Sequence, residues 1–290
     1  MAGLRTNIEI NVHERGPTAE KYAVYDAPPM CFSEGERHFK EFTNGRRLKD
    51  CEISAGIFYA RQRAGRPSGF CYSNGSFEGI DIKLPEKFVV YYSSSNSEVD
   101  AYPSNQTFFD GRRQLDLISE LGLLADSIGS HLVVRLHPNS SQADYEEIAR
   151  GVEPYPVTLI SPSSRIDSYQ LGMRASHRFS IGSTISWELM YDGYDVAILA
   201  NSIAINQPGC NTLRTAEEVF QYLKKSPICG AREFCIRIAD YSLNFGVQYH
   251  IYSSSGLHSG SLNWDLLDAL RDAFGEVRKH VRGRGSVVSP

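Results

Sequence analysis

The sequence predicts an α/β fold in which a parallel, Rossmann-like sheet carries helices on both faces. From about residue 86 onward, short apolar runs alternate with stretches of helical periodicity, and the loops between them are short. The chain has 290 residues, of which 41% are hydrophobic and 22% are charged. A chain of this size and composition has ample material for such a core.

The strand predictions rest on apolar runs that end in small or polar residues, and the helix predictions on apolar spacings of three and four. The expected strands are 84–94, 131–138, 157–162, 177–182 and 195–200. The first expected helix lies within 106–129, where apolar residues at helical spacing run from Leu115 to Ile128. The other expected helices are 144–152, 168–175, 184–193 and 215–225. Gly129 is expected to stop the first of these helices, and Asp167 to cap the third.

The two ends of the chain depart from this alternation. Residues 1–85 are rich in proline and glycine, with brief strand-like runs at 8–12 and 21–25, and we expect a short irregular segment there. The stretch 229–282 predicts helices, with an apolar stripe at Leu266, Leu267, Leu270, Phe274 and Val277, followed by a basic tail. We therefore divide the chain into 1–85, 86–228 and 229–290.

Charge and cysteine usage exclude several classes of protein. Thirty basic against 34 acidic residues give a net charge of −4, which does not suggest a nucleic-acid binder. No run reaches the ~18 apolar residues of a membrane span, and the N-terminus lacks the apolar stretch of a signal peptide. The six cysteines form no C-x-x-C pair. We expect a cytoplasmic protein with reduced thiols.

Candidate binding residues stand where the expected parallel strands end, because ligands of open α/β sheets bind beyond the carboxyl ends of the strands. Ser183 and Thr184 follow Gly182, and we expect one of them to cap the helix that begins there. The exposed N–H groups and the positive end of such a helix attract phosphate. Arg135 and His137 can add donors or charge. Further candidates are Ser94, Ser163 and Ser164.

Glu188 lies one helical turn after Thr184, on the same side of the helix. A carboxylate there can accept both hydroxyls of a ribose whose phosphate lies at the helix start. No zinc-type spacing of Cys and His is present, and the D-x-D pattern at Asp81 fails because Lys83 occupies its second acidic position. We expect no metal site.

Three segments, 135–139 (RLHPN), 163–171 (SSRIDSYQL) and 180–199 (SIGSTISWELMYDGYDVAIL), together resemble the C-terminal donor domain of a GT-B glycosyltransferase. The resemblance is to bacterial capsule and lipopolysaccharide enzymes, including sialyl- and 3-deoxy-manno-octulosonate transferases that use CMP-sugars. It covers roughly residues 86–225. It implies that His137-Pro138 and Ser183-Thr184 hold the nucleotide phosphate and that Glu188 binds the ribose.

The same resemblance implies a catalytic carboxylate that precedes a glycine in the N-terminal part. Glu14 in His13-Glu14-Arg15-Gly16 is the candidate base, although the family pattern has a second acid where Arg15 stands. GT-B enzymes have two Rossmann-like domains, and residues 1–85 are too few for one. We expect either a fragment of a longer protein or a reduced acceptor-side segment.

The expected function is metal-independent transfer of a sugar, without a cofactor, from a nucleotide-sugar to a growing surface glycan. A CMP-linked donor is the first candidate, and the acceptor is a glycan or lipid-linked glycan at the inner membrane face. A teichoic-acid-type glycerophosphotransferase, a nucleotide-sugar 2-epimerase and a non-catalytic nucleotide-binding scaffold of a polysaccharide assembly remain alternatives.

Overall fold

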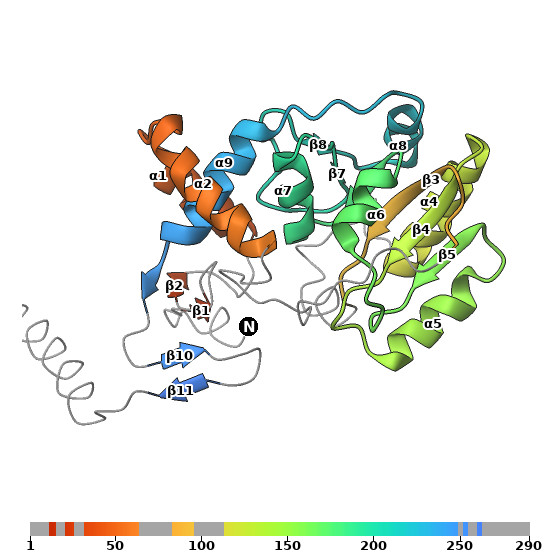
Figure 1. Ribbon diagram of the computed structural model, residues 1–290, viewed down its shortest axis with the longest axis horizontal. Helices are drawn as coiled ribbons and strands as arrows, with labels where there is room; N and C mark the ends of the chain where they lie inside the picture. Colours follow the sequence, from red (N-terminus) through yellow and green to blue (C-terminus); the bar gives the residue numbers. More distant parts are fainter. Residues whose placement is uncertain are drawn as a thin grey trace, which may run out of the picture.

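A six-stranded parallel sheet forms the centre of the computed structural model, which describes residues 12–15, 21–25, 32–63, 83–95, 113–248, 252–254 and 260–262. The strand order is β5-β4-β3-β6-β7-β8, and every neighbouring pair is parallel (Figure 1). The strands are β3 (Phe88–Tyr92), β4 (His131–Arg135), β5 (Val157–Ile160), β6 (Arg178–Ser180), β7 (Ala197–Ile198) and β8 (Asn211–Thr212). The predicted fold class is confirmed.

Helices cover both faces of this sheet, as the sequence predicts. They are α4 (Gln114–Ser127), α5 (Gln142–Val152), α6 (Ser168–Arg174), α7 (Thr184–Tyr191) and α8 (Ala216–Leu223). Side chains of β3 alternate between the faces, because successive residues of a strand point in opposite directions. Val89 and Tyr91 pack with α4, α5 and α8. Val90 and Tyr92 pack in the other core, which contains residues of α6 and α7.

Local sequence signals set the ends of these helices. The Asp167 carboxylate accepts the backbone N–H groups of Tyr169 and Gln170 at the start of α6, which confirms it as the cap. Gly129, with a φ of 66°, follows α4, and Ser130 N–H donates to the Ala125 carbonyl. That hydrogen bond closes a Schellman turn, which requires the left-handed backbone that glycine adopts readily.

The expectation of an irregular segment before residue 85 is wrong for residues 32–63. Two helices, α1 (Phe32–Thr43) and α2 (Leu48–Arg63), occupy this range. They pack against α9 (Arg232–Asn244), so that segments about 180 residues apart lie side by side (Figure 1). The expected strand at 21–25 is present as β2 (Lys21–Tyr25), which pairs with β1 (Val12–Arg15).

The expectation of helices throughout 229–282 is also wrong in part. After α9 the chain forms strands β9 (Val247–Gln248), β10 (Tyr252–Ser254) and β11 (Gly260–Leu262). β9 pairs with β2, and β10 pairs with β11. Serine and glycine, which are frequent between 253 and 261, are poor helix formers in a helix interior. The predicted stripe from Leu266 to Val277 and the basic tail lie outside the described residues.

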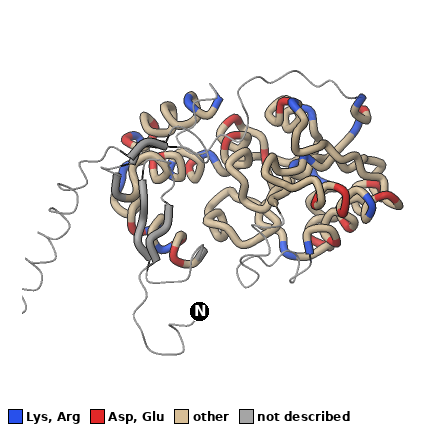
Figure 2. The backbone as a smooth tube through the Cα atoms, turned by 90° about the horizontal axis from the view of Figure 1, so that it is seen from below, with Lys and Arg blue, Asp and Glu red and all other residues tan. Residues whose placement is uncertain are grey.

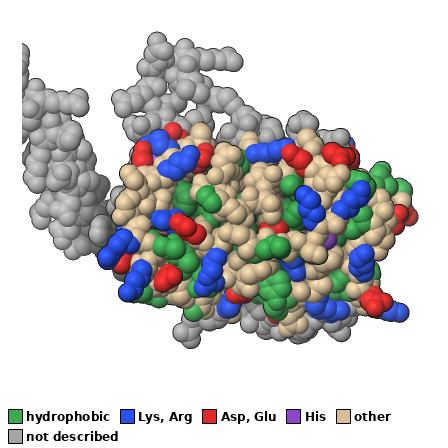
Figure 3. All heavy atoms as spheres, turned by 90° about the horizontal axis from the view of Figure 1, so that it is seen from above, with side chains coloured by type: hydrophobic (Ala, Val, Ile, Leu, Met, Phe, Trp, Pro, Cys, Tyr) green, Lys and Arg blue, Asp and Glu red, His purple; other side chains and the backbone are tan. Residues whose placement is uncertain are grey.

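Charged residues of both signs are interspersed over the described helices and loops (Figures 2 and 3). Among the described residues, no helix combines the length and the apolar character that a membrane crossing requires. The cysteines that the structure describes, Cys51, Cys210, Cys229 and Cys235, are free thiols.

Candidate nucleotide-binding site

The strand order places a switch point between β3 and β6. From β3 the chain proceeds to β4 and β5 on one side of the sheet, then returns to β6, β7 and β8 on the other. Helix connections therefore diverge at the carboxyl ends of β3 and β6, which is where open α/β sheets bind ligands. Ser94 follows β3, His137 follows β4 and Ser183 follows β6. The structure thus brings these predicted residues to one edge of the sheet.

The start of α7 presents unused backbone donors at this edge. Ser183 occupies the N-cap position, but its side chain makes no capping hydrogen bond, so Ser183 does not supply the cap that the sequence expects from Ser183 or Thr184. Ser186 N–H bonds to the Ser183 carbonyl at 2.9 Å. Within the described residues, the N–H groups of Thr184 and Ile185 have no partner, and Thr184 is exposed. An anion is therefore favoured at this helix end.

His137 and Pro138 form a tight turn at the end of β4. Ser140 N–H donates to the His137 carbonyl at 2.9 Å, which places Pro138 at the second position of the turn. Asn139 N–H donates to His137 Nδ1 at 3.2 Å. A neutral ring that accepts at Nδ1 carries its proton at Nε2. His137 is half-buried, so the sequence expectation of a donor here is compatible with its geometry.

Arg135 is committed to the neighbouring loop. It is 8% exposed, and its two terminal nitrogens donate to the carbonyls of Ser161 (2.5 Å) and Ser164 (2.9 Å). Burial lowers the pKa of its guanidinium. The side chain thus fixes the turn after β5, and a contribution to phosphate binding stays a prediction.

The serine candidates are held by local hydrogen bonds. Gln114, the first residue of α4, accepts the Ser94 N–H and donates to the Ser94 carbonyl, each at 3.0 Å. The hydroxyl of Ser163 lies 3.0 Å from that of Ser161, and the hydroxyl of Ser164 accepts the Ile166 N–H at 3.3 Å. These contacts order the loops at the strand ends, and binding roles for the three hydroxyls stay predictions.

Glu188 is more buried than its predicted ribose contact suggests. It is 5% exposed, and the Tyr169 hydroxyl of α6 donates to its carboxylate. Burial raises the pKa of Glu188 to about 7, against the opposing effects of the Tyr169 hydrogen bond and of the Arg63 charge. Arg63 itself pairs with Asp192 at the end of α7. The carboxyl therefore lies in the core between α6 and α7, next to the end of α2.

Replacement of Glu188 by glutamine should stabilise the protein at high pH. The pKa of Glu188 is about 7 in the folded protein, against 4.5 for the free group. Between pH 4.5 and pH 7, therefore, Glu188 keeps its proton in the native state but loses it in the unfolded chain. Stability then falls as pH rises through this window. We expect Glu188→Gln to unfold like the parent at pH 5 and to be more stable by roughly 2 kcal/mol at pH 8. Urea unfolding at both pH values measures this, and equal stability at pH 8 would contradict the buried carboxyl.

Glu14 lies in β1, where it pairs with Ala23 of β2. β2 in turn pairs with β9, which follows α9 directly. The strand that carries the proposed base is thus connected to the α1–α2–α9 helices through β9, and its catalytic role stays a prediction.

Four residues outside the predicted site set organise this edge. The Ser93 hydroxyl accepts the His137 N–H at 3.0 Å, and the Ser180 hydroxyl accepts two N–H groups of the loop before α7. Gln114 and Tyr169 hold Ser94 and Glu188 as described above. The positions of Ser93 and Ser180 at strand ends are a usable signal, whereas nothing local marks Tyr169 as a partner of Glu188.

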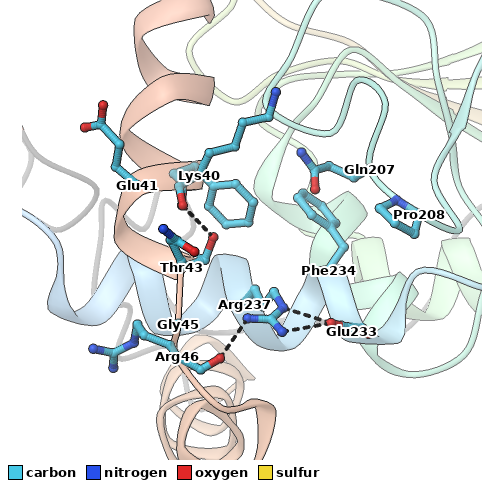
Figure 4. A pocket seen from close by; sticks show the side chains of 12 residues that line it. Lys40, Glu41, Thr43, Gly45, Arg46, Gln207, Pro208, Glu233, Phe234 and Arg237 are labelled. Carbon is cyan, nitrogen blue, oxygen red and sulfur yellow. Dashed lines mark hydrogen bonds and ion pairs between the residues drawn. The ribbon is translucent and has the colours of Figure 1, made fainter.

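A groove of about 640 Å³ lies elsewhere, between the end of α1, the start of α9 and Gln207-Pro208 (Figure 4). None of the residues that line this groove is one of the predicted site residues. The groove is not part of the switch-point site.

No known protein family matches the chain by sequence, and no curated protein matches it. Solved structures do. KpsC of Thermosulfurimonas dismutans, as its β-Kdo 2,7 transferase, has a TM-score of 0.50 at 9% identity, covering 82% of this chain and 72% of that one. The β-Kdo 2,4 transferase of the same protein has a TM-score of 0.47 at 10% identity, covering 82% and 73%. The wall teichoic acid polymerase TagF has a TM-score of 0.32 at 11% identity, and the match covers 71% of this chain and 42% of TagF.

The fold is therefore of the GT-B glycosyltransferase type. The sequence motifs imply the same fold. At 9% identity this likeness concerns the fold, and the chemistry has to be argued from the residues at the switch point.

Proposed function

We propose that the chain is a glycosyltransferase that moves a sugar from a nucleotide-sugar donor to a growing surface glycan of capsule or lipopolysaccharide type. One observation carries the proposal: the N–H groups of Thr184 and Ile185 have no partner among the described residues and begin a helix at the switch point. The turn at His137 ends the strand on the other side of β3. Two strand spacings, about 10 Å, separate these strands, which suits a nucleotide bridging the two ends.

In the proposed reaction, an acceptor hydroxyl attacks the anomeric carbon of the donor. The bond from that carbon to the phosphate oxygen breaks, and the negative charge grows on the leaving nucleotide. The start of α7 stabilises this charge in the manner of an anion hole, and the Nε2–H of His137 adds a second donor. The acceptor proton passes to the carboxylate of Glu14.

We assign the remaining roles in this reaction as the sequence analysis expects them. Residues 86–228 bind the donor, with Glu188 at the ribose after it exchanges its bond to Tyr169, and residues 1–85 serve the acceptor side. The donor is CMP-linked, no cofactor or metal takes part, and the acceptor is lipid-linked at the inner face of the membrane. Transfer of glycerol phosphate, by analogy with the teichoic-acid polymerases, is distinguished by the donor that supports turnover.

A thermal-shift panel tests the nucleotide site. CMP, CDP, UDP and GDP at millimolar concentration are compared, because a ligand that binds only the native state raises the melting temperature by mass action. We expect at least one to raise it, and His137→Ala to reduce the shift. His131→Ala is a matched control, since His131 lies at the opposite end of the same strand and contacts Thr158. No shift with any nucleotide would rule out the site.

A further inference from the structure

Ser180 is a fully buried residue at the carboxyl end of β6. It pairs with Tyr92 of β3 and with Ile198 of β7, so it lies beside the switch point. Its hydroxyl oxygen accepts two backbone N–H groups, those of Gly182 and Ser183, each at 3.1 Å. A hydroxyl that accepts N–H groups two and three residues later fixes the backbone into a tight turn.

This turn decides which N–H groups remain open at the start of α7. The donors of Gly182 and Ser183 are used by Ser180, and that of Ser186 is used by the Ser183 carbonyl. The donors left over within the described residues are those of Thr184 and Ile185, which are adjacent in the first turn of the helix. The Ser180 hydroxyl thus orders the turn that leads into α7, and it leaves the first donors of the helix itself open.

Ser202 packs closely against Gly182 in this turn. Gly182 has a φ of 104°, and a Cβ added there would lie 3.0 Å from the Cβ of Ser202. Ser202 is itself buried, and its hydroxyl accepts the Ala204 N–H at 3.2 Å. The Gly182-Ser183 turn is therefore fixed by the hydrogen bonds to Ser180, and Ser202 restricts the space beside Gly182, in the absence of any ligand.

We propose that Ser180 is a positioning residue, whose hydroxyl pre-organises the Gly182-Ser183 turn so that the Thr184 and Ile185 N–H groups receive the phosphate of the donor. This inference rests on the proposed function. Ser180 does not contact the phosphate; it removes two competing donors and holds the helix start in one geometry. Pre-organisation of this kind lowers the ordering cost of binding.

The test compares Ser180→Ala, Ser180→Thr and Ser176→Ala. Ser180→Ala removes the acceptor, whereas Ser180→Thr keeps it and suits a strand. Ser176→Ala is the matched control, because Ser176 donates to the Phe88 carbonyl at 3.0 Å just before the amino end of β6. The readouts are nucleotide affinity by calorimetry, using whichever nucleotide shifts the parent, and hydrogen exchange of the Gly182 and Ser183 amides in the ligand-free protein.

We expect Ser180→Ala to bind nucleotide roughly tenfold more weakly and to exchange both amides faster, with Ser180→Thr close to the parent in both. Ser176→Ala should keep the parent affinity and the parent exchange at these two amides. Parent-like affinity or unchanged exchange in Ser180→Ala would overturn the inference, as would equal weakening by Ser176→Ala. A parent protein that binds no nucleotide overturns the proposed function and with it the positioning role. In that case, faster exchange in Ser180→Ala would still show that the Ser180 hydroxyl protects the Gly182 and Ser183 amides.

Discussion

Replacing Glu14 by glutamine lowers turnover by roughly 10²–10⁴-fold while nucleotide binding is kept. An acceptor hydroxyl is a poor nucleophile near neutral pH, and an inverting transferase therefore needs a base within hydrogen-bond reach of it. Glutamine keeps the size of the side chain but cannot take the proton. The nucleotide contacts proposed at His137 and Thr184 belong to a different part of the chain, so they should not change. Initial rates and nucleotide affinity, measured on the same preparations, check both expectations.

Glu41→Gln is a suitable control for this experiment, because Glu41 is an exposed carboxylate on α1 that forms an ion pair with Arg37. Parent-like turnover is expected for it. Full activity of Glu14→Gln would remove Glu14 from the mechanism. Joint loss of turnover and nucleotide affinity would instead assign Glu14 a structural role in β1.

The parallel sheet was predictable because its signals are local. Short apolar strands, a left-handed glycine at Gly129 and the capping carboxylate at Asp167 each act within a few residues. The edge that carries the candidate site followed from the same pattern, since parallel strands in one sheet end on one side. Only the short strand β8 (Asn211–Thr212) lacked an apolar run that would have revealed it.

The two helices before residue 64 were not predicted from the sequence, because the contacts that stabilise them are made with distant parts of the chain. On α2 the buried residues are Cys51, Ala55, Phe58 and Tyr59, but the equally apolar Ile53 and Ile57 are exposed, so the sequence does not show which face is buried. On α1, by contrast, Arg37 pairs with carboxylates three residues before and four residues after it, a spacing that sequence reasoning could have used.

The state of Glu188 was unpredictable for a related reason. The helical spacing from Thr184 is correct, but it does not show what α6 places against the carboxylate. The Tyr169 hydroxyl and the burial that raises the pKa of Glu188 are tertiary effects. Likewise, the sequence identified the start of α7 and expected Ser183 or Thr184 to cap it, but it did not show that Ser180, from within the preceding strand, orders the turn before the helix.

The other large effect concerns the attachment of α1 and α2 to α9. Arg46, in the turn between α1 and α2, donates to both carboxylate oxygens of Asp240, at 2.7 and 3.1 Å. Asp240 is fully buried and also accepts from Asn244 at 2.7 Å. Removing one partner of such a pair leaves the other uncompensated, which usually costs 3–5 kcal/mol. Because Arg46 keeps 38% exposure and can be rehydrated, we expect Asp240→Ala to lose about 3 kcal/mol.

The stability lost in Asp240→Ala should be smaller at low pH than at neutral pH. Burial opposes ionisation of Asp240, but it is outweighed by hydrogen bonds from Ser54, Arg46, Cys51 and Asn244, so the pKa lies below its usual value of 3.8. A carboxyl with a lowered pKa stabilises the native state above its unfolded pKa, and this stabilisation disappears as pH falls through the folded value. The difference between parent and Asp240→Ala should therefore be full at pH 7 and shrink below about pH 4.

Asp50→Ala supplies the matched control for Asp240→Ala. Arg47 also donates to both carboxylate oxygens of Asp50, at 3.0 and 3.1 Å, but Asp50 is 52% exposed and Arg47 is 81% exposed. An ion pair of the same geometry in water contributes less than about 1 kcal/mol. Urea unfolding at pH 7 should thus separate the two variants by about 2 kcal/mol or more. Equal losses would mean that burial adds nothing to the Arg46–Asp240 pair, and that the other contacts of α1 and α2 hold them on α9.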